Sequence, residues 1–147
     1  MTFINKQNAF TLIELLVTVV IIGILSAIAI PNYMSSVVRG SRSAVQTELV
    51  QMAALQEKIY LNKNSYALAT AGTTTNIITA DYDGKETGGL GVTSGLSKDT
   101  KYSFSCASCT DQTFTLLATP DPAKGQKNDG SLSIDQAGRK VWGNTTW

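Results

Sequence analysis

Hydrophobic and polar positions divide the chain into stretches of different period. From Phe10 to Ile30 nearly every position is apolar, and only Glu14 carries a charge. As a helix this stretch would be about 31 Å long, which matches the hydrocarbon core of a bilayer. A carboxylate inside such a segment is costly and by default marks a functional position with a partner. The pattern therefore predicts a membrane-spanning helix, residues 10–31, in which Glu14 has a function.

A second helical pattern follows over residues 32–62. Apolar side chains recur there every three or four positions, at Val45, Leu49, Met52, Leu55 and Ile59. One apolar stripe on a polar helix is typical of a face packed on a core. Pro31 would normally break a helix, and together with Gly23 it brackets a stretch of weak helix propensity. We expect one long helix with a kink at Gly23 and Pro31.

Residues 63–101 form the predicted connection between helix and sheet. This segment is rich in Thr, Gly and Ala and has no helical period, and only Asn76–Ala80 predicts a short strand. The acidic run from Asp81 to Glu86 faintly resembles a calcium loop, but it lacks the spacing and the bidentate Glu of an EF-hand. A solvated turn is the favoured interpretation, and we expect no metal and no cofactor.

From residue 102 onward the period changes to two. Tyr102, Phe104 and Cys106 alternate with polar residues, as do apolar residues from Phe114. Two shorter runs follow at 132–135 and 139–142, and residues 143–147 are predicted as a tail. Four antiparallel strands within 102–142 would bury one face, and the helix stripe is the natural cover. The predicted fold is α+β, with a long kinked N-terminal helix packed on a four-stranded antiparallel meander.

Composition argues against an enzyme. The 147 residues allow one modest domain beyond the apolar segment, and 12 Lys and Arg nearly balance 11 Asp and Glu. Histidine is absent, which removes the commonest general base and most triad and zinc chemistry. The chain also has no paired-carboxylate motif and no GxxxxGK[ST] phosphate loop. We expect a structural protein without catalytic residues.

The start of the chain resembles the processing site of type IV prepilins. A short polar leader, residues 1–9, precedes the run from Ala9 to Leu16, AFTLIELL. The resemblance implies the pilin fold, cleavage between Ala9 and Phe10 by a prepilin peptidase, and N-methylation of Phe10. It also implies that Glu14 pairs with the new amine of a neighbouring subunit. Ala9 stands where the family usually has Gly, and the closing pattern DGSLSIDQAGRKVW resembles that of minor pilins.

This resemblance implies a precursor held in the inner membrane by a single helix, with its N-terminus in the cytoplasm. Inner-membrane machinery would then assemble it with other pilin subunits into an extracellular filament that serves twitching, adhesion or DNA uptake. A pseudopilin of type II secretion shares the processing motif and is the main alternative. A plain membrane anchor is another. A secretory signal peptide cleaved near Ala27–Ala29 is disfavoured, because its apolar core would be too long and would contain Glu14.

Cys106 and Cys109 form a CxxC motif, which can be a redox pair, half a zinc site or a disulfide. A redox pair needs a helix N-terminus, and a zinc site needs two more ligands, whereas the flanks here predict strands and no other Cys or His exists. Residues three apart across a tight turn lie within disulfide range. We expect a disulfide that closes the hairpin, in an oxidising compartment.

Basic residues gather in the Pro- and Gly-containing loop near residues 118–130. Lys124 and Lys127 lie in this loop, and Arg139 and Lys140 are expected near it across the meander. An ordinary soluble surface is the favoured interpretation. The sharper hypothesis is a patch that contacts phosphates at a filament tip, with DNA as a further partner.

Overall fold

The computed structural model describes residues 10–68, 76–92, 94–127 and 129–147. The chain forms two compact units, Met1–Val37 and Val38–Trp147. Helix α1, Leu12–Lys63, contains residues of both units. Helix α2, Asn76–Thr79, and five strands follow in the second unit.

Local signals at both ends of α1 explain its bounds. Thr11 precedes the helix, and its Oγ1 accepts a hydrogen bond from the Glu14 amide at 3.3 Å, as at many helix N-termini. Asn64 follows the last residue with a φ of 53° and donates its amide to the Tyr60 carbonyl at 2.7 Å. A residue in this left-handed conformation is a common helix stop. Gly23 and Pro31 lie inside the helix, and the kink predicted there stays a prediction.

The sheet has five antiparallel strands in the order of the chain, β1-β2-β3-β4-β5. The strands are Tyr102–Cys109, Phe114–Pro120, Leu132–Asp135, Lys140–Trp142 and Thr145–Thr146. The prediction of four strands was therefore one short. Residues 145 and 146, which were predicted as tail, pair with Trp142 and Val141. Two residues are too few for a period of two to appear in the sequence.

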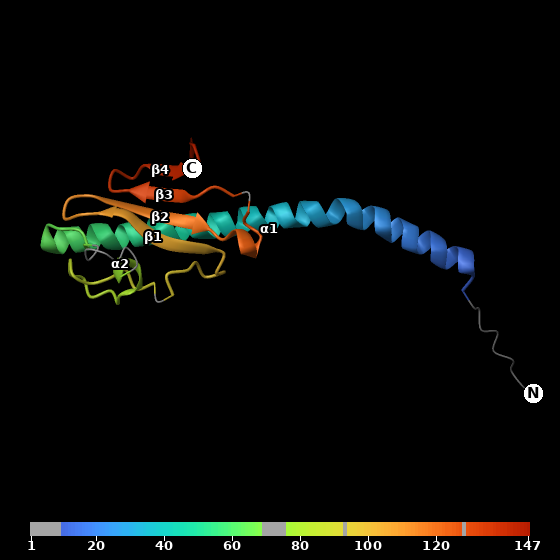
Figure 1. Cartoon of the computed structure of the whole chain (residues 1–147), viewed down its shortest axis with the longest axis horizontal. Coiled ribbons are helices and arrows are strands. Elements are labelled where there is room, and N and C mark those ends of the chain that lie inside the picture. Colours follow the sequence, from blue (N-terminus) through green and yellow to red (C-terminus); the bar gives the residue numbers. More distant parts are fainter. Residues whose placement is uncertain (1–9, 69–75, 93, 128) are drawn as a thin grey trace, which may run out of the picture. The chain divides into compact units, whose positions relative to one another are not determined.

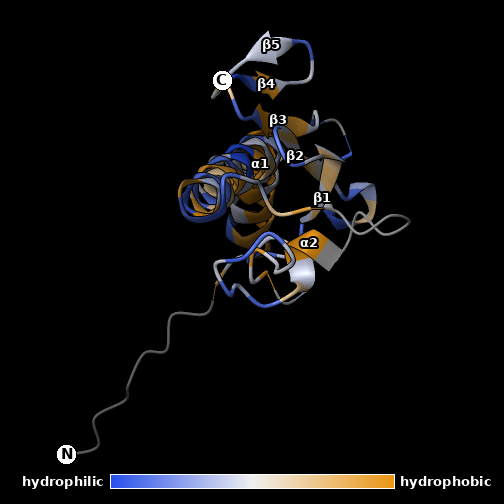
Figure 2. Ribbon diagram, turned by 90° about the vertical axis from the view of Figure 1, so that its left-hand side faces the viewer, coloured by the Kyte–Doolittle hydropathy of each residue, from blue (hydrophilic) through white to orange (hydrophobic). Residues whose placement is uncertain are grey.

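The core of the second unit lies between α1 and the sheet (Figure 1). Four of the five predicted stripe residues are buried and Leu55 is partly buried. The strands contribute Tyr102, Phe104, Phe114, Leu116 and other buried apolar side chains. Figure 2 shows α1 end-on beside the strands, which succeed one another from β5 to β1. These observations confirm the predicted α+β architecture.

The segment expected to form a short strand is instead helix α2. Its Ile77 and Ile78 are buried, and their carbonyls accept hydrogen bonds from the amides of Leu90 and Val92 at 2.7 and 2.9 Å. Gly89 permits this close return of the chain, because a Cβ there would lie 2.0 Å from the Ala80 carbonyl oxygen. The apolar pair at 77 and 78 gave no period that could distinguish one helical turn from a strand.

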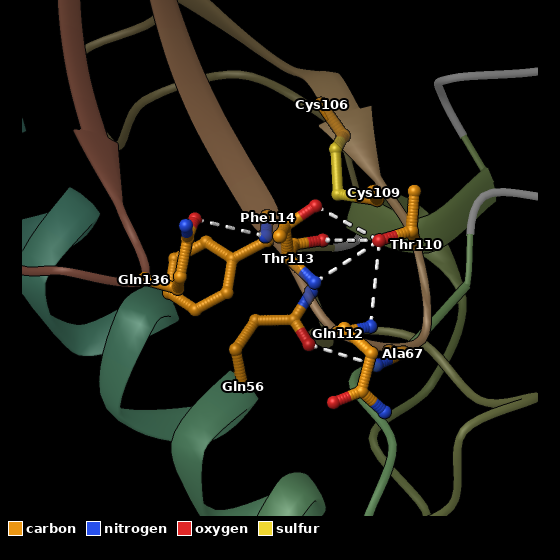
Figure 3. The surroundings of a disulfide bond; sticks show 9 residues. All are labelled: Gln56, Ala67, Cys106, Cys109, Thr110, Gln112, Thr113, Phe114 and Gln136. Atoms are coloured by element: carbon orange, nitrogen blue, oxygen red, sulfur yellow. Dashed lines mark hydrogen bonds between the residues drawn. A yellow bond between two sulfur atoms is a disulfide. The ribbon is translucent and has the colours of Figure 1, made fainter.

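Cys106 and Cys109 form a disulfide, but both lie within β1 (Figure 3). Residues three apart in a regular strand point to opposite faces of a sheet. The pairing with β2 is shifted at Ala107, so that Cys106 lies opposite Leu116 and Cys109 lies opposite Phe114. This β-bulge puts both cysteines on the core side, with their Cα atoms 6.1 Å apart. The disulfide therefore spans a bulge and does not close the hairpin.

Candidate functional site

The first candidate site is the start of α1. Phe10 is 81% exposed and Glu14 is also exposed, two residues into the helix. No salt bridge of the described residues includes Glu14. A carboxylate in the first helical turn is favoured by the helix dipole, which partly offsets its presence in an apolar stretch. Ala9, on the other side of the predicted cleavage point, lies outside the described residues.

The apolar side chains around Glu14 are uncovered. Residues such as Leu12, Ile13, Leu15 and Leu25 are each more than 60% exposed. Within the described residues, α1 is the one helix that is long and apolar enough to cross a membrane. An apolar surface of this extent needs a bilayer or other protein to cover it.

A second candidate site lies where β1 begins and β2 ends. Lys124 donates to the Thr100 carbonyl at 2.7 Å, and Lys101 donates to Ser41 Oγ at 3.0 Å. Lys98 lies two residues before Thr100, and exposed Lys127 shares the β2–β3 loop with Lys124. We call Lys98, Lys101, Lys124 and Lys127 the lysine cluster.

The structure separates Arg139 and Lys140 from this cluster. The loop that holds Lys124 and Lys127 enters β3 at Leu132, whose partner in β4 is Trp142. Lys140 lies opposite Ile134, toward the other end of β3, and Arg139 forms a salt bridge with Asp135 at 3.0 Å. The expectation that these two residues lie near the loop was wrong, because an antiparallel turn returns the chain at the far end of the strand.

A buried ion pair anchors the lysine-bearing loop. The Asp129 carboxylate, whose side chain is fully buried, accepts hydrogen bonds from the Arg42 guanidinium and the Tyr102 hydroxyl. Arg42 also stacks over Trp142, with its Cζ 3.7 Å from the ring centroid. Burial, followed by the hydrogen bond to Asp129, raises the pKa of Tyr102 above its ordinary value of 10.0. These contacts fix the loop against α1 and β4.

The backbone conformation of Thr100 and the charge of Asp99 are two further features of this end of the sheet. Thr100 has a φ of 60°, a conformation that is strained for a β-branched residue. Burial would raise the pKa of the neighbouring Asp99, but hydrogen bonds from Ser97, Ser41 and the Lys101 amide outweigh it and lower that pKa. Asp99 is therefore ionised at neutral pH and partly offsets the lysine charges.

A groove of about 400 Å³ opens beside the lysine cluster, between α1 and residues 90–100. We call its apolar lining residues the floor; they are Met52, Leu55, Leu90, Val92 and Leu96. We call its polar lining residues the rim, which includes Glu48, Gln51, Ser94, Lys98 and Thr100. Lys98 and Thr100 thus belong to both the groove and the end of the sheet where the lysines gather.

The acidic run from Asp81 to Glu86 forms a turn. Asp83 Oδ1 accepts the Lys85 amide at 2.9 Å, and Asp83 also lies 3.9 Å from the Lys85 ammonium. Within the described residues, no three Asp, Glu, Cys or His side chains come together in a way that could hold a metal ion.

The chain is similar to known proteins of the type IV pilus. Residues 4–30 match the prokaryotic N-terminal methylation motif, and the long helix packed on an antiparallel sheet agrees with the class of type IV pilins. Residues 31–133 match the family described as "Type IV minor pilin ComP, DNA uptake sequence receptor", and the chain belongs to this family.

Two type IV pilus proteins and one type II secretion protein are similar to parts of this chain. The type IV major fimbrial protein FimA of Dichelobacter nodosus is 42% identical over 77 residues, 52% of this chain and 49% of FimA. The type IV major pilin protein PilA of Myxococcus xanthus is 40% identical over 65 residues, 44% of this chain and 30% of PilA. The type II secretion system core protein G of Klebsiella pneumoniae is 29% identical over 68 residues, 46% of this chain and 49% of that protein. The chain thus spans about half, or less, of the length of these relatives.

A solved structure supports the fold. The non-core minor pilin PilV of Neisseria meningitidis superposes with a TM-score of 0.52 at 17% identity, over 77% of this chain and 93% of PilV. The predicted pilin fold is therefore confirmed, with five strands instead of four.

Sequence reasoning missed Lys98, Lys101 and the groove. Lys98 and Lys101 lie in the segment predicted as a structureless connection, and the contact from Lys124 to Thr100 joins residues 24 positions apart. The charges of Lys98 and Lys101 were visible in the sequence, but their proximity to Lys124 follows from the antiparallel pairing of β1 with β2.

Proposed function

We propose that this protein is a minor subunit of a type IV pilus that contacts DNA through its lysine cluster. The observation that carries the first half is the uncovered apolar start of α1 with Glu14 inside it. Cleavage after Ala9 would give Phe10 a free amine, which is then methylated. The amine of one subunit and the Glu14 carboxylate of its neighbour would attract strongly in an environment of low dielectric.

Mass spectrometry of the protein from cells tests the processing step. The expected mature chain begins at Phe10 and carries one methyl group on its amine. An unprocessed chain in normal filaments would contradict the proposal, as would a chain that begins at Ile30. The assembly partners are other pilin subunits and the inner-membrane machinery.

The second half of the proposal concerns DNA. The family description names a DNA uptake sequence receptor, and the lysine cluster supplies up to four cations at one end of the sheet. Phosphate contacts by lysines make DNA affinity fall with salt, by roughly one unit of logarithmic slope for each contact. Asp129 and Arg42 would hold two of these lysines in place through the loop that they anchor.

Salt-dependent binding of duplex DNA to the detergent-solubilised full-length chain tests this idea. Replacing Lys98, Lys101, Lys124 and Lys127 by Ala should weaken binding at low salt and reduce the slope by roughly two to four. The matched control replaces Arg139 and Lys140, which lie toward the opposite end of β3. An equal loss of affinity in the control would show that the cluster has no special role.

A pseudopilin of type II secretion is the second candidate, because the chain also resembles core protein G. The two functions separate by phenotype. Loss of a minor pilin should impair pilus-dependent processes such as twitching, adhesion or DNA uptake, and leave protein secretion intact. Loss of a pseudopilin should block secretion.

A further inference from the structure

We infer that the groove beside the lysine cluster binds an unpaired nucleobase of the DNA whose phosphates contact the lysines. This inference rests on the proposed DNA function and adds to it the form of DNA that is preferred. The lysines account for contact with a phosphate backbone, which single and double strands share. The groove adds an apolar cavity with a polar rim, which a paired base inside a duplex cannot enter.

The floor of the groove suits the face of a base. Met52 and Leu90 are buried beneath it, whereas Leu55, Val92 and Leu96 are only partly buried and present apolar surface. Bases that leave the stack are commonly held between aromatic or apolar side chains. At about 400 Å³ the groove is at the small end of the range for ligand pockets, which fits one base better than a larger group.

The rim supplies groups that recognise the edge of a base. Gln51 is exposed on α1 and can offer both a donor and an acceptor, as Gln does toward adenine. Glu48 can accept from an exocyclic amino group, although one of its oxygens already accepts the Lys98 amide at 3.3 Å. A carboxylate at the rim disfavours a phosphate inside the groove, so the phosphates should remain on the lysines.

Continuity between groove and cluster supports one ligand that occupies both. Lys98 lies on the rim, and Thr100, also on the rim, accepts the hydrogen bond from Lys124. The strained backbone at Thr100 lies at the junction. A nucleotide unit has its phosphate and its base next to each other, which matches a cationic site that adjoins an apolar one.

The test uses the full-length chain in detergent and single-stranded oligonucleotides that contain one 2-aminopurine, a fluorescent adenine analogue. Binding should change the 2-aminopurine fluorescence and should be tighter than binding of the same base paired in a duplex. Leu55→Ala and Leu96→Ala should each weaken single-strand binding by about tenfold, because each removes apolar surface that would cover the base. Their salt slope should stay that of the unchanged protein, because the lysines remain. Leu61→Ala, the same substitution at an exposed position on α1 outside the groove, should change nothing.

Gln51→Ala provides a variant with little effect on folding, since this side chain is exposed. In competition with unlabelled oligonucleotides that differ only at this position, it should reduce the preference for adenine over the other bases. Unchanged fluorescence and affinity in Leu55→Ala, Leu96→Ala and Gln51→Ala would overturn the inference. The same holds if these variants lose self-association but not DNA binding, since a second copy would then occupy the groove. If the variants of the lysine cluster bind DNA normally, the proposed DNA function fails. If those variants bind weakly but the groove variants bind normally, only the inference about the groove fails.

Discussion

The two units of the chain expose their apolar residues in opposite ways. In the first unit, large apolar side chains from Phe10 to Met34 are mostly more than half exposed. In the second, 18 buried hydrophobic residues among those that the structure describes form one core, and few of the described large apolar side chains remain outside it. The second unit therefore has its own core, whereas the first depends on a bilayer or on neighbouring subunits for burial.

Their charged groups differ in the same way. In the second unit, Asp129 meets Arg42 and Tyr102 within the chain. In the first, Glu14 has no ion-pair partner among the described residues, and we propose that a neighbouring subunit supplies one. Charges in low dielectric require compensation in both places. The difference suggests where each unit obtains its stability: the second unit compensates Asp129 within the chain, whereas the proposed compensation of Glu14 comes from another subunit.

Glu14→Ala should give the largest effect. It tests whether the first unit depends on a partner from another subunit. We expect loss of filament incorporation with normal insertion of the precursor in the membrane, because the substitution removes only the carboxylate that we propose pairs with a neighbouring amine. Immunoblots of sheared filaments and of membranes measure the two outcomes. Ser26→Ala, on the same helix, is the control and should assemble normally. Normal assembly of Glu14→Ala would refute the proposed pairing.

Asp129→Ala tests whether the ion pair inside the second unit stabilises its fold, and it should lower the free energy of unfolding. The substitution leaves the Arg42 guanidinium, whose side chain is only 19% exposed, without its carboxylate. Breaking a buried pair in this way costs about 3–5 kcal/mol. Urea unfolding of the detergent-solubilised chain, followed by Trp fluorescence, measures the loss. Asp111→Ala is the control, because this side chain is exposed and a surface substitution of this kind usually changes stability by about 0.5 kcal/mol or less. Equal losses in the two variants would mean that Asp129 is not buried as described.

Replacing both Cys106 and Cys109 by Ser should have a smaller effect. A disulfide that closes so short a loop stabilises by about 2 kcal/mol in the chain-entropy model. The β-bulge at Ala107 also puts both cysteines on the core side. Loss of the disulfide should therefore loosen the adjoining turn at residues 110–113. Unfolding curves with and without a reductant measure this. A matching shift of the unchanged protein on reduction is the control, and a stability unaffected by reduction would contradict the prediction.

How far the sequence predicts this molecule depends on the range of the contacts involved. The helix stripe, the alternation in β1 and β2 and the apolar start of α1 are local patterns, and each led to the correct element. The bulge that brings Cys106 and Cys109 to one face depends on register with β2, and no local pattern reveals it. The lysine cluster likewise depends on the antiparallel return of β2 beside β1. Residues distant in sequence were therefore grouped wrongly, as for Arg139 and Lys140.

The smallest predicted effect is a loss of stability at alkaline pH. It should arise from buried tyrosines of the second unit and not from the exposed first unit. Burial, followed by a hydrogen bond to Glu57, raises the pKa of Tyr66 to about 12, and the pKa of Tyr102 is also raised. Each folded phenol then holds its proton above pH 10, where the unfolded one releases it. The stability that they contribute is complete below pH 10 and is lost as pH rises through the folded pKa values. Free energies of unfolding between pH 8 and roughly 11 should fall, and Tyr66→Phe should reduce the slope, because its ring cannot titrate. Tyr33→Phe, in the first unit where the residue is 71% exposed, is the control and should leave the slope unchanged. A slope that Tyr33→Phe reduces as much as Tyr66→Phe would show that burial in the second unit is not its cause.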